Sequence, residues 1–567
     1  MWHVRRIGLM VFLILLAGCN RNTGVVPQPS LSEPAWFEDV TARAGLKFQH
    51  DCGPITSSYF MPQMFGSGCA FFDFDGDDRL DIFLLHNGGP SGAKYQLFQQ
   101  QTDGTFRDVS VGSGLDVAGY GMGVAIGDVN NDGRPDIAIT EYGATRLFVN
   151  ERTGRFREVT RAAGLDNPQW GTSCAFFDYD RDGNLDLVIA NYVDYDKSIK
   201  CTSRGGKLDF CGPNFFGSTV ARLFRNLGSA AGMEIRFEDV TAKAGFGAAK
   251  GKGLGVLCAD FDGDRWPDIL LANDIMANHL WINQRNGTFR EEAIKRGIAY
   301  TVSGASAANM GTAWADVDGN GLFDVFITHL VDETHTLWKQ NTPGFFEDRT
   351  IAAGLTTGRR STGFGTAFVD LDRDGWVDLP FVNGAVVRNP TARDSDPFWS
   401  QYVQRNQLYA NLGKGKFREI SEHNPALCGF DCVGRGLAVG DFDNDGAPDL
   451  LVTEIAGGAR LLRNIAPANG HWLGVRAILP KHRRDAYGAE IRVRAGGATY
   501  ARLLYPGYSY CSSSDPRCFF GLGQFKRYDG ITVIWPDGTE ELFAGGAADR
   551  QVELRQGQGS PASNPKR

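Results

Sequence analysis

The 567-residue chain lacks the short motifs by which common hydrolases, metalloproteases, nucleotide-binding enzymes and c-type haem proteins are recognised. It contains no G-x-S-x-G, H-E-x-x-H, Walker A or C-x-x-C-H sequence. Histidine is scarce, with nine residues scattered along the chain. On these absences we expect a protein that is not an enzyme.

The chain also lacks an excess of positive charge and the apolar content of a multi-span membrane protein. Its 58 Lys and Arg against 66 Asp and Glu give a net charge of −8, which argues against a nucleic-acid partner held by bulk charge. At 42% apolar and 22% charged residues, the composition is typical of a globular protein. Glycine is abundant, at 72 residues without a collagen period, and indicates many tight turns.

The N-terminus has the pattern of an export signal. The apolar run Ile7–Ala17 has 11 residues, which suits a signal peptide and is shorter than the roughly 20 residues of a membrane span. Leu16-Ala17-Gly18-Cys19 resembles a bacterial lipoprotein signal. We expect residues 1–18 to be a signal peptide, Cys19 to carry lipid and residues 19–35 to be a tether; an ordinary secretory signal is the alternative. The protein would then lie in the periplasm or at the cell surface, anchored to an outer membrane if one is present.

Cysteine usage agrees with an oxidising compartment, because ten cysteines remain after Cys19. Three close pairs are expected to form local disulfides: Cys201 with Cys211, Cys428 with Cys432, and Cys511 with Cys518. Three others lie in apolar strand-like runs and are expected to be small buried thiols: Cys69, Cys174 and Cys258. The pairing of Cys52 does not follow from its spacing.

The dominant feature is the pattern D-x-[DN]-x-[DN]-x-x-x-D, which occurs seven times. So many carboxylates within nine residues repel one another unless a cation compensates, and Ca²⁺ takes six to eight oxygens at about 2.3–2.6 Å. An EF-hand would need Glu at position 12 between helices, whereas position 12 here is apolar and lies in a strand-like run. We therefore expect up to seven structural Ca²⁺ ions in β-hairpin loops, with these ligands: Asp73, Asp75, Asp77 and Asp81; Asp128, Asn130, Asp132 and Asp136; Asp178, Asp180, Asp182 and Asp186; Asp260, Asp262, Asp264 and Asp268; Asp316, Asp318, Asn320 and Asp324; Asp370, Asp372, Asp374 and Asp378; Asp441, Asp443, Asp445 and Asp449.

The flanks of the acidic loops repeat as well. Each unit of about 50 residues has a small-residue strand, an apolar strand, a Leu-Phe-x-Asn strand and a Phe-x-[DE]-Val-Thr strand, which is typical of a propeller blade. Phe37 begins a copy of the fourth strand before the first loop, and no copy follows Asn464. We therefore predict an all-β fold with a seven-bladed propeller over residues 36–465, in which residues 36–41 complete the last blade.

Together the repeats resemble the FG-GAP/VCBS family of calcium-binding propellers, the repeat type of integrin α-subunit heads. The remainder resembles the ASPIC/UnbV domain through Asn469–Val475, Phe520–Gly523 and Ile531–Gly538. We place this small β-rich domain at 466–555 and a flexible tail at 556–567. The pair in this order is similar to bacterial relatives of cartilage acidic protein. The resemblance implies calcium binding and recognition or adhesion outside the cytoplasm, with weaker first and fourth sites where Asp78 and Arg265 replace glycine at position 6.

The propeller geometry assigns features to its two faces. The acidic turns join strands 1 and 2, whereas the long segments 47–66, 192–219 and 384–407 join other strands and should crowd the opposite face. Five residues beyond position 9, each repeat carries a polar residue that either bonds the loop backbone at a strand end or forms a ligand ring around the central depression. These residues are His86, Glu141, Asn191, Asn273, His329, Asn383 and Glu454.

Three functions are therefore open: recognition or adhesion with a glycan or protein ligand, a carbohydrate-active metal-dependent lyase or dehydratase using His86, His329, Glu141 and Glu454, and a structural partner module.

Without residues 1–18 the chain carries 56 basic and 66 acidic residues, and seven Ca²⁺ would change its charge from −10 to +4. An acidic polysaccharide is therefore an admissible extracytoplasmic partner. We expect the protein to contact a membrane only through its lipid anchor.

Overall fold

A computed structural model of the chain describes residues 34–562, apart from 153, 204, 229–234, 357–359, 390, 392, 394 and 468. The expected signal peptide, Cys19 and the tether up to residue 33 lie outside these residues, so export and lipidation stay predictions. Pro34–Arg567 is one compact unit. Within the described residues, none of the helices is long and apolar enough to cross a membrane.

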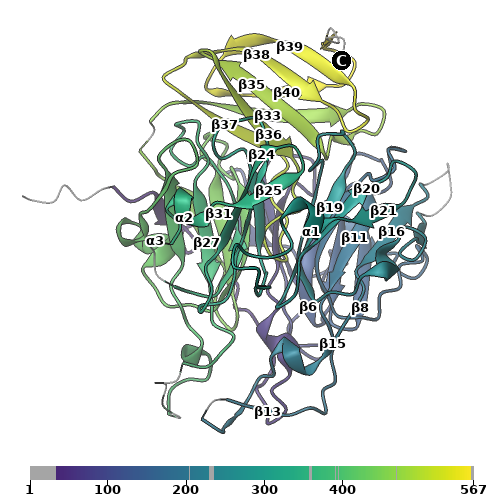
Figure 1. Ribbon diagram of the computed structural model, residues 1–567, viewed down its shortest axis with the longest axis vertical. Helices are drawn as coiled ribbons and strands as arrows, with labels where there is room; N and C mark the ends of the chain where they lie inside the picture. Colours follow the sequence, from purple (N-terminus) through teal and green to yellow (C-terminus); the bar gives the residue numbers. More distant parts are fainter. Residues whose placement is uncertain are drawn as a thin grey trace, which may run out of the picture. The chain divides into compact units, whose positions relative to one another are not determined.

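Seven four-stranded antiparallel sheets form a β-propeller (Figure 1). The innermost strands consist largely of small and apolar residues and are almost wholly buried; β6 (Gly121–Gly127) and β18 (Gly253–Ala259) are buried along their whole length. The second strand of each blade is equally buried, because neighbouring blades cover both of its faces. The predicted seven-bladed all-β fold is confirmed.

The blades follow the chain in order. They comprise β2 (Cys69–Phe72), β3 (Asp81–Leu84), β4 (Gln96–Gln100) and β5 (Phe106–Asp108); β6, β7 (Asp136–Glu141), β8 (Ala144–Glu151) and β9 (Arg155–Glu158); β10 (Gly171–Phe177), β11 (Asp186–Asn191), β16 (Arg222–Asn226) and β17 (Phe237–Asp239); β18, β19 (Asp268–Asn273), β20 (His279–Asn283) and β21 (Phe289–Glu291); β22 (Thr312–Ala315), β23 (Asp324–Ile327), β24 (Thr336–Thr342) and β25 (Phe345–Asp348); β26 (Gly363–Thr366), β27 (Leu379–Asn383), β28 (Gln407–Asn411) and β29 (Phe417–Glu419); and β30 (Gly434–Gly440), β31 (Asp449–Glu454), β32 (Arg460–Asn464) and β1 (Phe37–Asp39).

Helices are short and lie in the connections. They are η1 (Met61–Met64), η2 (Pro213–Phe215), η3 (Phe246–Ala248), α1 (Ala293–Arg296), α2 (Thr350–Ala353), η4 (Trp399–Gln401), η5 (Ser421–His423) and α3 (Pro425–Cys428).

The N-terminal strand closes the ring. β1 pairs antiparallel with β32, with Phe37 opposite Asn464 and Asp39 opposite Leu462. The Phe37 side chain is buried, at 2% exposure. This confirms the predicted closure, in which the N-terminal strand covers the outer edge of β32 and ties both ends of the propeller together.

The three long segments meet at one end of the propeller, as predicted. Tyr59, Phe210 and Phe398 come from the three segments in turn, with ring centroids 5.5 Å apart for Tyr59 and Phe210 and 6.0 Å for Phe210 and Phe398. The second segment adds two small hairpins, β12 (Val193–Asp194) with β15 (Gly217–Ser218) and β13 (Cys201–Thr202) with β14 (Leu208–Asp209). In Figure 1, β13 and β15 lie at the bottom, at the end remote from the C-terminal strands.

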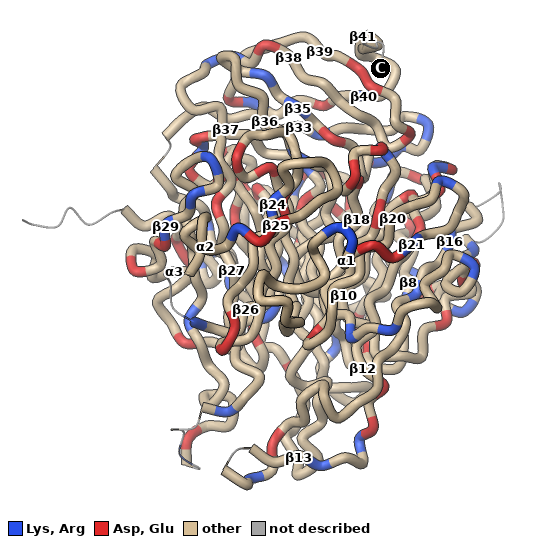
Figure 2. The backbone as a smooth tube through the Cα atoms, viewed as in Figure 1, with Lys and Arg blue, Asp and Glu red and all other residues tan. Residues whose placement is uncertain are grey.

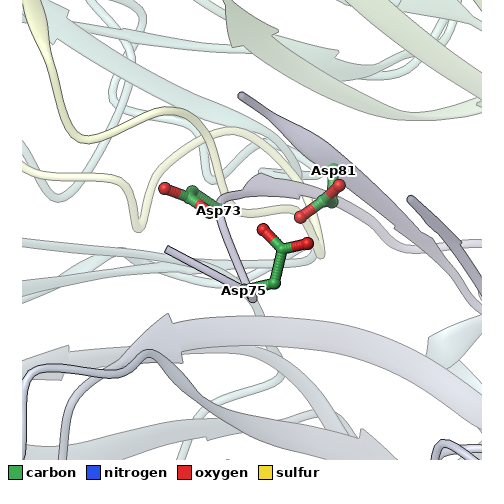
Figure 3. Close-up of side chains that lie close together, drawn as sticks. All are labelled: Asp73, Asp75 and Asp81. Carbon is green, nitrogen blue, oxygen red and sulfur yellow. The ribbon is translucent and has the colours of Figure 1, made fainter. Parts of the chain in front are cut away.

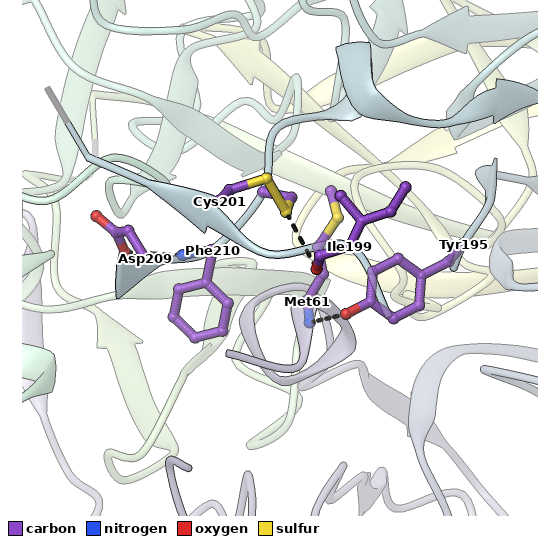
Figure 4. The surroundings of a disulfide bond; sticks show 7 residues. Met61, Tyr195, Ile199, Cys201, Asp209 and Phe210 are labelled. Carbon is purple, nitrogen blue, oxygen red and sulfur yellow. Dashed lines mark hydrogen bonds between the residues drawn. A yellow bond between two sulfur atoms is a disulfide. The ribbon is translucent and has the colours of Figure 1, made fainter. Parts of the chain in front are cut away.

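One of the three expected disulfides is present. Cys201 and Cys211 are bridged beside Phe210 and Tyr195 (Figure 4). The other two pairings are wrong, because Cys432, Cys511 and Cys518 are free thiols. Cys52 is also a free thiol, and Cys69, Cys174 and Cys258 are buried free thiols as expected.

The C-terminal residues form two further sheets. One contains β33 (His471–Leu479), β34 (Arg484–Asp485), β37 (Cys518–Gly523) and β40 (Arg550–Arg555). The other runs in the order β36 (Ala498–Leu504), β35 (Ala489–Ala495), β38 (Arg527–Ile534), β39 (Glu540–Ala547) and β41 (Ser560–Pro561). Because β41 pairs with β39, the described residues after 555 belong to this domain and the expected flexible tail does not begin there.

A segment of the C-terminal domain, residues 505–517, threads into the centre of the propeller. Its backbone bonds to the innermost strands of four blades: Ser513 with Cys69 and Phe71, Cys511 with Val124, Ser509 with Thr312, and Asp515 with Val439. Tyr510 is fully buried, and its hydroxyl donates to the Phe65 carbonyl at 2.9 Å. We call residues 505–517 the plug. Cys511 lies within it and Cys518 begins β37, which explains why two cysteines so close in sequence are not bridged.

Candidate functional site: the acidic loop face

The first acidic loop shows the geometry of the repeat. Asp73, Asp75 and Asp81 offer carboxylate oxygens that all lie within 4.8 Å of one another, and Figure 3 shows these carboxylates gathered around one point. Asp73 sits where β2 ends and Asp81 where β3 begins. The nine-residue turn between two paired strands therefore brings the first and last carboxylates together.

Backbone donors hold the carboxylate at position 1. Asp73 Oδ1 accepts from the amides of Gly76 and Asp77 at 2.7 and 3.1 Å, and its Oδ2 accepts from Asp78 at 2.9 Å. The amide at position 6 makes the same bond in the fourth loop, where Arg265 donates to Asp260 Oδ2. Asp78 and Arg265 take left-handed φ values of 63° and 72°, so the turn keeps its shape without glycine.

The carboxylate at position 9 joins the loop to the third strand. In the third blade, Asp186 Oδ2 accepts from the Tyr179 amide and Oδ1 from the Asn226 amide, at 3.0 and 2.8 Å. The same two bonds recur in every blade, at Asp81, Asp136, Asp268, Asp324, Asp378 and Asp449. These seven carboxylates are at most 1% exposed.

An amide side chain at the end of the third strand links six of the seven blades to a neighbour, a role that the sequence reasoning missed. In the fifth blade, Gln340 Nε2 instead donates to the Phe323 carbonyl of its own acidic loop. Asn226 Nδ2 donates to the Val129 carbonyl of the preceding acidic loop at 2.8 Å. Equivalent bonds start from Gln100, Asn150, Asn283, Asn411 and Asn464 and reach Phe442, Phe74, Tyr179, Val317 and Leu371. The repeated asparagine of Leu-Phe-x-Asn was the available signal, because a polar residue at a fixed place in an apolar strand needs a partner.

Burial raises the pKa of these acids. Burial is the main cause that raises the pKa of Asp81 and Asp324 to about 8, and neighbouring carboxylates add to it. The pKa of Asp136 and of Asp186 is raised well above the ordinary value for the same main reason. The loops therefore hold negative charge at a high electrostatic cost.

The donor set fits a hard cation. All the groups that converge are carboxylate or amide oxygens, and Asp178 Oδ1, Asp180 Oδ1 and Asp370 Oδ1 are buried without a hydrogen-bond partner. An orphaned buried carboxylate oxygen is costly unless a donor or a cation meets it. Among the described residues, close carboxylate triplets occur in the first, third, fourth, sixth and seventh loops. The second and fifth loops each carry an asparagine, Asn130 and Asn320, at one of the four positions.

Basic side chains neutralise part of the loop charge. Arg225 contacts Asp180 at 2.6 Å, Arg463 contacts Asp443 at 2.6 Å, and Lys339 contacts Asp318. All three cations directly precede the amide residue at the end of the third strand, which explains why they reach the loop of their own blade.

The C-terminal domain covers this face. Arg484 is buried there and donates to Asn131 Oδ1 and the Gly183 carbonyl at 3.0 and 3.1 Å. Gly521 N donates to Asp370 Oδ2 at 2.8 Å, and Arg517 donates to the Asp441 carbonyl at 2.8 Å. Figure 2 shows acidic and basic segments interspersed where β33 and β37 approach the propeller.

The seven polar residues beyond position 9 lie at strand ends, as both interpretations require. Asn191, Asn273 and Asn383 each donate to a backbone carbonyl of the following connection, at 2.7–2.9 Å.

His86 Nδ1 accepts from the Asp51 amide at 2.9 Å. Glu141 Oε1 accepts from the Tyr95 hydroxyl at 2.6 Å. His329 contacts Thr336 Oγ1 at 3.0 Å, and Glu454 is half-buried at the end of β31. This geometry favours the strand-end interpretation over the ligand ring.

The fold and the face define a class: a seven-bladed propeller with acidic 1–2 turns, capped on that face by a two-sheet domain. The FG-GAP-like repeat model matches residues 73–139, 128–189, 260–327 and 394–452, and the ASPIC and UnbV model matches residues 479–561. The chain is therefore an FG-GAP-repeat protein with a C-terminal ASPIC/UnbV domain.

Similar proteins support this family. Cartilage acidic protein 1 of Xenopus tropicalis is 24% identical over 376 residues, which cover 63% of this chain and 53% of that protein. The human protein of that name is 27% identical over 318 residues, covering 54% and 44%. The chain thus spans about half the length of these relatives.

Solved structures show weaker likenesses. An Agrocybe aegerita lectin that recognises non-reducing terminal N-acetylglucosamine aligns with a TM-score of 0.38 at 15% identity, covering 74% of this chain and 90% of the lectin. The BP39L lectin from Burkholderia pseudomallei aligns with a TM-score of 0.42 at 11% identity, covering 71% and 97%. Neither likeness carries weight in the functional argument.

Proposed function

We propose that this chain is an exported recognition or adhesion module whose propeller is stabilised by calcium, anchored outside the cytoplasm through lipid on Cys19. The observation that carries the proposal is the ring of acidic loops, in which buried carboxylate oxygens converge without enough donors to satisfy them. A stable scaffold that holds long segments at one end and a second domain at the other suits binding.

Calcium would act on stability. Extracellular sites bind at about 10⁻⁴–10⁻³ M, so millimolar calcium contributes roughly 0.4–1.4 kcal/mol for each occupied site. Several such contributions are comparable with the whole stability of a domain, about 5–15 kcal/mol. We expect EDTA to lower the melting temperature by roughly 5–15 °C and millimolar Ca²⁺, but not Mg²⁺, to restore it. A melt that EDTA leaves unchanged refutes structural calcium.

Recognition has its own test. The full chain is applied to an array of glycans in calcium and in EDTA, and we expect calcium-dependent retention of a saccharide that is recovered unchanged. An unsaturated product would instead indicate a lyase. Nothing among the described residues favours the lyase, because His86, His329 and Glu141 are each buried. Each is also bonded to another residue of the protein: His86 to Asp51, His329 to Thr336 and Glu141 to Tyr95.

A further inference from the structure

A cavity of about 850 Å³ lies between the acidic loop face and the C-terminal domain. Its propeller side is formed by the first two acidic loops, including Asp75 and Asp128, and its other side by β33, β34 and β40 with Trp472 and Arg550. The plug residues 514–517 also line it. This volume lies within the range of ordinary ligand sites, about 300–1,000 Å³. We call it the interdomain cleft.

We propose that the interdomain cleft binds an acidic saccharide, a chain of uronic acid residues, whose carboxylates meet two arginines and a divalent cation held by the first loop. The assignment rests on the function proposed above, because it names the ligand and the site of that recognition.

The cleft presents positively charged side chains that have no acidic partner. Arg483 and Arg550 are exposed at the cleft, and no contact of either side chain with a carboxylate occurs among the described residues. The four acids of the C-terminal domain that line the cleft already have partners. Asp485 contacts Arg476 and Asp515 contacts Arg517, both at 2.7 Å, while Asp549 contacts His471 and Glu553 contacts Arg555, both at 2.6 Å. Free guanidinium groups bind carboxylates by charge-assisted, bidentate hydrogen bonds.

The first acidic loop offers a place for the divalent cation at the edge of the cleft. Its Asp75 and Gly76 are exposed and line the cleft, and the Asp78 side chain is 89% exposed, 3.7 Å from Arg476 across the gap. The loop gathers three carboxylates, whereas Ca²⁺ takes six to eight oxygens. A cation held there would retain coordination positions open to the cleft, and the carboxylate and hydroxyl oxygens of a uronic acid suit such positions.

The charge of the cleft makes calcium a condition for binding. Its lining contains eight carboxylates and six arginines, a net charge of −2. The divalent cation of the first loop would bring this to 0, and a second cation in the second loop would bring it to +2. The indole of Trp472, which packs against Gly446 of the seventh loop, adds an aromatic surface at the same wall.

The cleft is also fixed in shape before any ligand enters. The plug bonds to the inner strands of several blades, and Arg484 joins the second and third loops to β34. Binding to a preformed site loses little conformational entropy.

The test is calorimetric titration of the full chain with a linear oligo-uronate in calcium. Three comparison ligands are its neutral methyl ester, a sulfated neutral oligosaccharide and an oligo-glutamate peptide. We expect the oligo-uronate to bind and the ester to fail. Tighter binding of the sulfated sugar, or of the peptide, overturns the assignment to a uronic acid ligand.

Two pairs of variants locate the site. R483Q/R550Q should weaken oligo-uronate binding roughly tenfold or more, whereas R161Q/R236Q, at exposed arginines outside the cleft lining, should change it by less than about twofold. D75N should abolish binding, and D166N, at an exposed aspartate outside the acidic loops and the cleft lining, should leave it in place. Melting temperatures show that all four variants fold.

The outcomes separate the two proposals. Oligo-uronate binding that survives in R483Q/R550Q and D75N overturns the cleft while leaving recognition intact. A chain that takes up calcium by direct titration and binds no oligo-uronate also overturns the cleft. A chain that takes up no calcium and is retained on no glycan or protein surface refutes the proposed function itself.

Discussion

At the scale of single residues, the structure is governed by buried carboxylates that each have a fixed set of partners. The seven acids at position 9 accept two backbone amides apiece, so they hold the blade together even before a cation binds. Their burial makes the ionised form costly. Stability without metal should therefore depend on pH in a direction opposite to that of most proteins.

The first prediction concerns this pH dependence. The pKa of Asp81 and of Asp324 is raised to about 8 from an ordinary 3.8, mainly by burial. A folded state that binds protons more tightly than the unfolded state loses stability as pH rises between these two pKa values. The urea midpoint in EDTA should therefore fall between about pH 5 and pH 8, and calcium should flatten the curve. An EDTA curve that rises over this range contradicts the prediction.

The second prediction tests the link between blades. Asn226 is fully buried, and its Nδ2 donates to the carbonyls of Val129 and Leu185 at 2.8 and 3.0 Å. Asn226→Asp places an ionised oxygen against two carbonyls and should cost about 3–5 kcal/mol in the free energy of unfolding, measured in urea.

Asn286→Asp is the matched control. Among the described residues, Asn286 bonds only through its side-chain oxygen, which accepts from Thr288, and a carboxylate can accept in the same way. This variant should stay within about 0.5 kcal/mol of the parent chain. Equal losses in the two variants would mean that Nδ2 contributes nothing.

At the scale of elements, the sequence predicted the strands well where a repeat marked them. Each acidic loop marks the end of one strand and the start of the next, and both are buried and apolar. The spare fourth strand at Phe37 predicted the closure, because only a ring leaves one copy ahead of the first loop. The cysteine pairs were less informative, since closeness in sequence is necessary but not sufficient for a bridge.

The third prediction measures the strength of the closure. Phe37 and Phe106 occupy the same place in the fourth strands of the last and first blades, at 2% and 5% exposure. Replacing either by Ala should cost about 3–5 kcal/mol in the free energy of unfolding, because both leave a buried cavity. Phe345→Ala, at 48% exposure, is the control and should cost much less. A Phe37→Ala chain as stable as the control would show that β1 does not close the ring.

At the scale of the whole molecule, the two parts predicted from sequence are one structural unit. The plug carries no periodic pattern, and its contacts join residues hundreds of positions apart, such as Tyr510 and Phe65. Local propensity therefore contains no signal for them. The same holds for Arg484, whose partners Asn131 and Gly183 belong to two different blades.

The fourth prediction follows from this union: the propeller and the C-terminal domain unfold together. Trp281 in β20 reports on the fourth blade, and Trp535, just after β38, reports on the C-terminal domain; both are 1% exposed. With fluorinated tryptophan, their NMR signals should disappear at the same urea concentration. Tyr510→Ala removes a fully buried ring that packs on Phe364 with centroids 4.9 Å apart. It should lower the free energy of unfolding reported by both signals by about 3–5 kcal/mol, so that both urea midpoints fall together. A Trp535 signal that is lost while Trp281 stays native would show that the domain docks without contributing to the propeller. In that case the interdomain cleft would open before the blades separate.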